Sequence, residues 1–309
     1  MSATSLTTLP DRVKICEVGP RDGLQNESTL VSVEDKIRYI DMLSDANAPI
    51  VEATSFVSPK AIPQLADAGE VFRRIAKRPG VTYLVLVPND RGLERAIDAD
   101  VKAIAVFTAA SESFTKRNIG MTIDESLSTF AAVVKRARAE GMWIRGYIST
   151  AFGCPYQGAV PVENVVRVAE RLADMGIDEL SIGDTIGVAT PNQVVDVAGA
   201  LQEKMPVERL AMHFHDTRGT ALANVMAALQ MGIASFDSAA GGLGGCPYAP
   251  GASGNLSTED LLYMLHGMGI DTGIDLDKIR AASRFIASKL DHPLTSRAYV
   301  ALEAAAARA

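Results

Sequence analysis

Short runs of apolar and β-branched residues recur along the chain, and each is followed by turn residues and a segment with helical periodicity. Most of the spacings leave room for a crossover helix between parallel strands. Repeated alternation of this kind fits a closed parallel barrel or an open doubly wound sheet. There are eight such runs, and they begin near Val13, Ile50, Thr82, Ala103, Trp143, Glu179, Leu210 and Ser235.

The segments between these runs carry helix signals of their own. Thr122–Glu125 and Thr190–Gln193 match capping boxes, and Pro191 stands at the first helical position of the second one. Apolar residues from Val165 to Leu172 recur at i, i+3, i+4 and i+7, which predicts one buried helix face. The pattern therefore predicts helices in the crossover segments.

Polar residues favour the barrel over the open sheet, because they cluster at the C-terminal end of nearly every run. All such ends converge on one face of a (β/α)8 barrel, whereas an open sheet concentrates its chemistry at one switch point. The sequence therefore predicts an α/β protein with a (β/α)8 TIM barrel over about residues 13–256. The polar ends are Arg21-Asp22, Glu52–Ser55, Pro88-Asn89, Thr108, Ser149-Thr150, Gly183–Thr185, His213–Asp216 and Ala239–Gly242.

Two further helical stretches follow the eighth run, at 258–268 and from 277 to about 307. They exceed what a barrel requires, so we expect a C-terminal helical extension, about residues 257–309, that packs beside it. No linker or low-complexity stretch indicates a second domain. We predict a single catalytic domain over residues 1–309.

Charge and composition narrow the range of partners. The formal net charge of −7 disfavours nonspecific binding to nucleic acid, which requires a basic field. No apolar run approaches the roughly 20 residues of a membrane span, so we expect no membrane partner. Residues 1–12 resemble neither a signal nor a transit peptide, and three cysteines, an odd number, do not suggest a disulfide framework. These features predict a cytoplasmic protein.

The segment His213-Phe214-His215 is the most informative short pattern. Because side chains alternate along a strand, both imidazoles lie on the same face, which would be the barrel interior. Two imidazoles about 7 Å apart at their backbones can converge on one divalent metal ion. The alternative is a pair of core histidines satisfied by hydrogen bonds.

Oxygen ligands for such an ion are available nearby in the predicted barrel. Asp22 ends the first run and is a natural hard ligand, while Asn255, beyond a glycine-rich segment, offers a neutral oxygen. Two nitrogen and two oxygen ligands suit Mg²⁺ or Mn²⁺ better than closed structural zinc, which prefers thiolates. Both residues also have a plainer explanation as turn residues, Asp22 before Gly23 and Asn255 after Gly254.

Arg21 immediately precedes this aspartate. A guanidinium at the mouth of a barrel is permanently charged and forked to hold an oxyanion, although a surface ion pair is the alternative. Neighbouring residues of a strand point opposite ways, so Arg21 and Asp22 both reach the site only if Gly19-Pro20 and Gly23 bend the chain. The local sequence leaves this point open.

Gly241–Pro247 follows the eighth run and contains too many glycines for regular structure. We expect a mobile loop at the catalytic face that can close over a substrate. Cys246 at its tip is either a proton donor delivered by closure or an incidental thiol. The glycines do not fit the Gly-x-Gly-x-x-Gly pattern that opens a helix, which disfavours a dinucleotide site.

Six segments together resemble the 3-hydroxy-3-methylglutaryl-CoA lyase family of metal-dependent TIM-barrel lyases. The resemblance runs from about Val13 to Leu265, in order and with compatible spacing. Two departures, Ser28 where many relatives have Lys and Ala61 where some carry Trp, bear on the acyl group rather than on the reaction type. The segments are Val18–Glu27, Glu52–Lys60, Gly153–Tyr156, Gly183–Gly187, His213–Asp216 and Gly241–Pro247.

The resemblance implies a divalent-metal-assisted cleavage, of retro-aldol or Claisen type, that splits 3-hydroxy-3-methylglutaryl-CoA into acetoacetate and acetyl-CoA. The ion would be Mg²⁺ or Mn²⁺. Its ligands would be Asp22, His213, His215 and Asn255. Catalytic residues would be Arg21 as the charge stabiliser, Cys246 as the loop acid/base and Glu52 as a catalytic or supporting carboxylate. The reaction also requires a base for the C3 hydroxyl proton; Asp22 and His213 are the candidates, a metal-bound histidine lacks a free lone pair, and the sequence does not choose between them.

Further residues would support the site or bind the acyl-CoA. The resemblance implies such roles for Gln25, Ser181 and Asp184. Lys116 and Arg117 follow the fourth run on the catalytic face and are the best local basic candidates for the CoA phosphates. A solvated loop charge pair is the alternative for these two residues.

Two other functions compete with this one. One alternative is action on a related branched 3-hydroxyacyl-CoA, as a lyase or as a condensing enzyme, but related synthases usually carry an added regulatory domain. Little chain follows the predicted barrel here, which favours the lyase. A catalytically silent barrel that acts as a binding protein is disfavoured, because the arginine, the aspartate, both histidines and the loop cysteine all remain. The expected partners are a small acyl-CoA substrate and, for a homodimer, a second copy of the chain.

Overall fold

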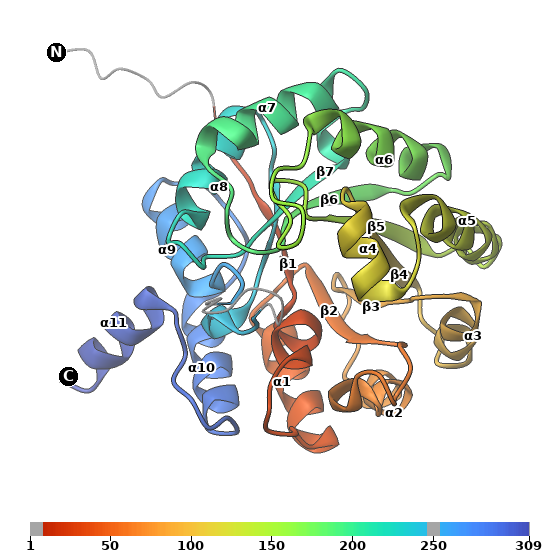
Figure 1. The fold of residues 1–309 in the computed structure, drawn as a ribbon. Helices are drawn as coiled ribbons and strands as arrows, with labels where there is room; N and C mark the ends of the chain where they lie inside the picture. The colour runs from red at the N-terminus through yellow and green to blue at the C-terminus, as the bar shows by residue number, and fades with distance from the viewer. Residues whose placement is uncertain (1–8, 246–253, 309) are drawn as a thin grey trace, which may run out of the picture.

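Eight parallel strands close into a barrel in chain order, with β1 paired to β8 (Figure 1). The computed structural model describes residues 9–245 and 254–308. The predicted (β/α)8 barrel is confirmed, and its strands begin at the predicted residues, apart from a one-residue difference in the first. The strands are β1 (Lys14–Glu17), β2 (Ile50–Ser55), β3 (Thr82–Leu86), β4 (Ala103–Ala109), β5 (Trp143–Ser149), β6 (Glu179–Asp184), β7 (Leu210–Phe214) and β8 (Ser235–Ser238).

Helices surround the barrel, and both predicted capping boxes are present at the starts of α5 and α7. None of the helices in the described part of the chain is both long and apolar enough to cross a bilayer. The helices are α1 (Val33–Asp45), α2 (Ala68–Arg74), α3 (Asp90–Asp98), α4 (Glu112–Ile119), α5 (Ile123–Ala139), α6 (Val162–Asp174), α7 (Pro191–Gln202), α8 (Ala221–Gln230), α9 (Thr258–Gly267), α10 (Leu276–Ala287) and α11 (Arg297–Ala306).

The chain after β8 forms α9, α10 and α11, and α10 packs against α1 (Figure 1). The predicted continuous helix from 277 to about 307 is wrong, because α10 ends at Ala287 and α11 begins at Arg297. Pro293 lies between them; proline lacks an N–H donor and forces the preceding residue toward extended backbone. The domain boundaries proposed from the sequence stay a prediction.

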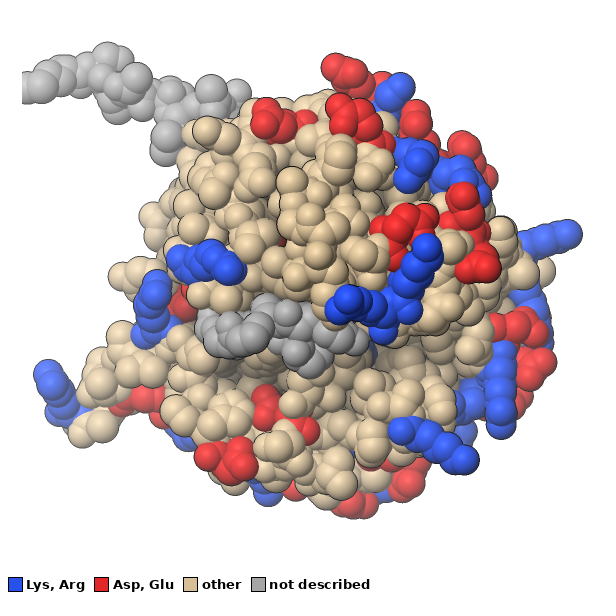
Figure 2. Space-filling view, in the orientation of Figure 1, with Lys and Arg blue, Asp and Glu red and all other residues tan. Residues whose placement is uncertain are grey.

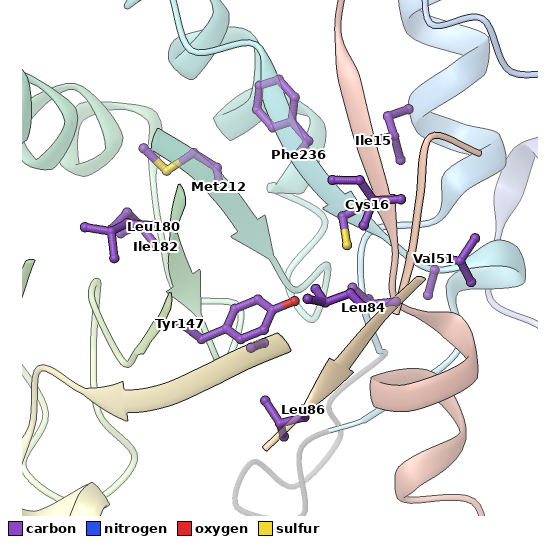
Figure 3. Close-up of a cluster of buried hydrophobic side chains, with 14 of the residues drawn as sticks. Ile15, Cys16, Val51, Leu84, Leu86, Tyr147, Leu180, Ile182, Met212 and Phe236 are labelled. Carbon is purple, nitrogen blue, oxygen red and sulfur yellow. The ribbon is translucent and has the colours of Figure 1, made fainter. Parts of the chain in front are cut away.

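Apolar side chains from the strands fill much of the barrel (Figure 3). Cys16 of β1, Tyr147 of β5 and Phe236 of β8 are all buried. In Figure 3 the Tyr147 ring points across the barrel toward Cys16 and Leu84. The guanidinium carbons of Arg21 and Arg145 lie 5.6 and 5.1 Å from the centroid of this ring, so an aromatic side chain contacts both cations.

Charged residues also lie inside the barrel, among the apolar side chains of its core. Arg145 of β5 is fully buried, with its Nη1 2.7 Å from Asp237 Oδ1 and its Nε 2.9 Å from Glu179 Oε1. Lys14 Nζ contacts the second carboxylate oxygen of Glu179. Because each buried charge has a partner of opposite sign, the cost of removing it from water is partly offset. These ion pairs join β5, β6 and β8.

Candidate active site

A short π-helical turn, η1 (Gly19–Gly23), places Arg21 and Asp22 at the C-terminal end of β1. The amides of Arg21, Asp22 and Gly23 all donate to the Val18 carbonyl, at 3.2, 2.8 and 3.1 Å. In this tight turn successive side chains no longer point to opposite faces as they do along a strand, so Arg21 and Asp22 both reach the mouth of the barrel. Arg21 Nη1 lies 2.6 Å from Asp22 Oδ1, which answers the question that the local sequence left open.

Asp22, His213 and His215 form a cluster whose ligand atoms all lie within 4.8 Å of one another. An isolated bridge between His215 and Asn255 brings the fourth predicted ligand to the same place. Asn255 Nδ2 donates to Asp22 Oδ2 at 3.0 Å, while Asn255 Oδ1 is buried and has no hydrogen-bond partner among the described residues. His215 Nδ1 is likewise buried without a partner in that part of the chain. Imidazole nitrogens, a carboxylate and an unsatisfied amide oxygen fit a divalent cation.

The protonation states of Asp22 and His215 suit metal binding. Burial would raise the pKa of Asp22, but the charges of Arg21, His213 and His215 outweigh it and lower this pKa to about 2. Burial and the neighbouring His213 lower the pKa of His215 to about 4. Near neutral pH, Asp22 is therefore a carboxylate and His215 a neutral imidazole, the forms that bind metals.

Arg21 is also paired with Glu52, and the pair is buried. Arg21 Nη2 lies 2.7 Å from Glu52 Oε2, and Arg21 is only 7% exposed. The sequence-based alternative of a surface ion pair is therefore wrong for Arg21. Burial raises the pKa of Glu52, although the charge of Arg21 opposes this. With carboxylates on two sides, the guanidinium is held in a fixed orientation at the mouth of the barrel.

A cavity of about 450 Å³ opens beside this cluster, a size typical of a small-molecule site. Its lining includes apolar side chains, among them Leu86, Phe107, Phe114, Ile119, Met121 and Phe130. The lining also contains six of the predicted site residues, namely Arg21, Asp22, Gln25, Ser181, His213 and His215. The cavity can therefore hold a ligand with both a polar and an apolar part.

Other predicted residues lie around the cavity rather than in its lining. Asp184 accepts hydrogen bonds from the amides of Val188 at 2.9 Å and Ala189 at 3.0 Å, so it organises the loop after β6. Lys116 and Arg117 are exposed on α4, the helix that contributes Phe114 and Ile119 to the cavity. Figure 2 shows basic side chains gathered over α4. Cys246 lies outside the described residues.

Three buried charged residues near the site were missed by the sequence reasoning: Glu17, Arg145 and Asp237. Asp237 Oδ2 lies 3.1 Å from His213 Nδ1. Each of the three stands in a strand directly after a buried apolar residue. A charge inside such a strand was the available signal, because a barrel interior accepts a charge only together with a partner.

Glu17 joins the two segments that carry the predicted catalytic residues. Its Oε1 accepts hydrogen bonds from the amides of Gly19, in η1, and Ala240, at the base of the glycine-rich segment, both at 2.9 Å. Its Oε2 accepts a 2.6 Å hydrogen bond from Thr258 Oγ1, at the start of α9. Burial nevertheless raises the pKa of Glu17 from 4.5 to about 7.

We expect Glu17→Gln to flatten the pH dependence of stability. Because the folded-state pKa is raised, the stabilising effect of protonated Glu17 is complete below about pH 4.5 and is lost as the pH rises through about 7. At about 1.4 kcal/mol for each unit of pKa, the loss is about 3 kcal/mol. Urea unfolding at pH 5 and pH 8 measures it. The exposed substitution Glu34→Gln is the control, and equal pH slopes in wild type and Glu17→Gln would contradict the prediction.

Comparison with known proteins gives one consistent family. Residues 12–286 match the family model described as HMGL-like. The chain is 54% identical over 297 residues to the mitochondrial hydroxymethylglutaryl-CoA lyase of Bos taurus, covering 96% of this chain and 91% of that one. The crystal structure of hydroxymethylglutaryl-CoA lyase from Pseudomonas aeruginosa superposes with a TM-score of 0.94 at 50% identity, covering 96% of this chain and 99% of that one. An HMG-CoA lyase from Acinetobacter baumannii, in complex with coenzyme A and 3-methylmalate, superposes with a TM-score of 0.89 at 40% identity, covering 96% and 95%.

Proposed function

The chain belongs to the HMGL-like family, and on that premise we propose that it is a hydroxymethylglutaryl-CoA lyase. It cleaves 3-hydroxy-3-methylglutaryl-CoA to acetoacetate and acetyl-CoA. The observation that carries this assignment is the convergence of Asp22, His213, His215 and Asn255 beside the buried Arg21 at one end of the barrel.

Four side chains from three parts of the fold would hold the divalent cation: Asp22 after β1, His213 and His215 at the end of β7, and Asn255 before α9. When bound, such an ion supplies Lewis-acid polarisation of the oxygen atoms of the substrate. Hard oxygen ligands mixed with imidazole support Mg²⁺ or Mn²⁺ as the ion.

Cleavage removes the proton of the C3 hydroxyl and breaks the C2–C3 bond, whose electron pair passes to the departing thioester as an enolate. Arg21 faces the cavity and is fixed by Asp22 and Glu52, so its charge is oriented before negative charge develops on the substrate. Asp22 and His213 face the same cavity and are the candidates for accepting the hydroxyl proton, His213 only while its Nε2 is not bound to the ion. Protonation of the enolate carbon is assigned to Cys246 on the basis of the sequence resemblance.

One assay tests the assignment. Purified protein is incubated with 3-hydroxy-3-methylglutaryl-CoA and Mg²⁺ or Mn²⁺, with and without EDTA, and the products are identified by mass. We expect acetoacetate and acetyl-CoA in equal amounts, and loss of both products in EDTA. Faster turnover of another branched 3-hydroxyacyl-CoA, or net condensation from the products, would refute the proposed substrate or direction.

We further propose that Lys116 and Arg117 bind phosphate groups of the CoA. The support is their exposure on α4 beside the cavity, and the two cations would attract the phosphates from solvent. The double variant Lys116→Gln/Arg117→Gln is expected to raise KM roughly 2- to 30-fold with kcat unchanged, since each exposed charge contributes about 0.2–1 kcal/mol.

A matched control is available in Lys135 and Arg136, a second adjacent Lys-Arg pair in the last turns of α5. Because barrel helices run antiparallel to the strands, this pair lies toward the opposite face. The double variant Lys135→Gln/Arg136→Gln is expected to leave KM within twofold of wild type. An equal rise in KM for both double variants would indicate a general charge effect and remove Lys116 and Arg117 from the proposal. A homodimer and a cytoplasmic location stay predictions.

A further inference from the structure

Asp237 lies directly behind one of the proposed metal ligands. It pairs with His213 in the register between β7 and β8, and its Oδ2 is 3.1 Å from His213 Nδ1. His213 also clusters with Asp22 and lines the cavity, so with Nδ1 beside Asp237 its other ring nitrogen, Nε2, is the one available to a metal ion. The distance between the two side chains is that of a hydrogen bond.

The Asp237 carboxylate has little freedom to move. Ser181 Oγ donates to Asp237 Oδ2 at 2.9 Å, and Arg145 Nη1 lies 2.7 Å from Oδ1. Arg145 is itself fixed by Glu179, at 2.9 Å from its Nε. Asp237 and Arg145 are 1% and 0% exposed. The carboxylate is therefore held from β5 and β6 while it contacts an imidazole of β7.

We propose that Asp237 is a positioning residue that fixes the tautomer and ring orientation of His213. In this arrangement the proton is on Nδ1, which donates to Asp237, and the lone pair of Nε2 faces the site. Carboxylates behind metal-binding histidines commonly act in this way, and their loss typically weakens metal affinity by about 10- to 100-fold. The inference rests on the metal ligands of the proposed function, and it assigns to Arg145 the task of holding Asp237.

The first test measures metal affinity without catalysis. Metal-free Asp237→Asn is titrated with Mn²⁺ and the free ion is followed by electron paramagnetic resonance, alongside wild type. We expect an apparent Kd about 10- to 100-fold higher in the variant. The matched control is Asp67→Asn, which removes the partner of Lys36, at 2.8 Å, outside the barrel interior. The control is expected to bind Mn²⁺ within threefold of wild type.

The second test requires no substitution, so it applies even if Asp237→Asn does not fold. Nitrogen NMR of metal-free wild type, labelled with ¹⁵N-histidine, reports which ring nitrogen of His213 carries the proton. Burial lowers the pKa of His213, but the hydrogen bond and charge of Asp237 raise it above its ordinary value, so the spectrum is recorded at a pH high enough for this imidazole to be neutral. At that pH we expect protonated Nδ1 and unprotonated Nε2. The opposite tautomer, or an unchanged Mn²⁺ affinity in a folded Asp237→Asn, overturns the inference. If wild type itself binds no Mn²⁺, the failure lies instead with the proposed metal site.

Discussion

Arg21→Gln is expected to fold, to bind Mn²⁺ as wild type does, and to cleave 3-hydroxy-3-methylglutaryl-CoA with a kcat lowered by about 10²–10³. Loss of one preorganised donor at a developing oxyanion typically costs about 2.7–4 kcal/mol, and the buried, doubly paired guanidinium is preorganised in this sense. Steady-state kinetics with Mn²⁺ saturating measures the effect. Turnover near the wild-type rate would remove Arg21 from the mechanism.

The substitution Arg21→Gln also leaves Glu52 buried without its cation, which by itself destabilises the fold. The double variant Arg21→Gln/Glu52→Gln separates the two effects, because it removes both charges together. If kcat is lower in the double variant than in Glu52→Gln alone, while the thermal stability of the double variant returns toward wild type, the missing guanidinium causes the loss of activity. Arg21→Lys provides a further comparison, since it restores the charge without the fork and is expected to recover only part of kcat.

The barrel could be predicted because its signal is local and repeated. Each strand appears in the sequence as a short apolar run, and the start of β2 at Ile50 or β5 at Trp143 is visible without knowledge of its neighbours. Helix starts such as Thr122 are similarly local, because a capping box involves residues only three apart. The end of α10 was not predicted, since apolar periodicity continues past Ala287 and only the nearby Pro293 indicates a break.

The residues of the candidate site also fall into two groups, those that the sequence could predict and those that it could not. His213 and His215 could be placed on one face by strand alternation alone, and both line the cavity. The turn at η1 could not be predicted, because its three amides converge on one carbonyl, that of Val18, in a geometry that no residue pattern specifies. Asp237 and Arg145 were missed for another reason. Their pairing depends on the register among β5, β6, β7 and β8, which a single sequence does not contain.

His215→Ala is expected to have the second large effect, on metal binding and therefore on activity. Removing a direct ligand lowers metal affinity more than removing a supporting group does, so the affinity for Mn²⁺ should fall by more than about 100-fold. The loss of metal binding can be measured without substrate, as a change in thermal stability. A ligand that binds only the folded state stabilises it by about 2.7 kcal/mol at a concentration 100 times its Kd. Mn²⁺ at that concentration should therefore raise the Tm of wild type and leave that of the variant nearly unchanged.

His266→Ala is the matched control, because it makes the same substitution in α9, where the imidazole Nε2 lies 2.9 Å from Thr272 Oγ1 and away from the cavity. This control should keep both the Mn²⁺-dependent rise in Tm and the EDTA-sensitive activity. A His215→Ala variant that still gains the full rise in Tm would mean that the ion binds elsewhere. The cluster of Asp22, His213 and His215 would then require another explanation, despite the short distances between its ligand atoms.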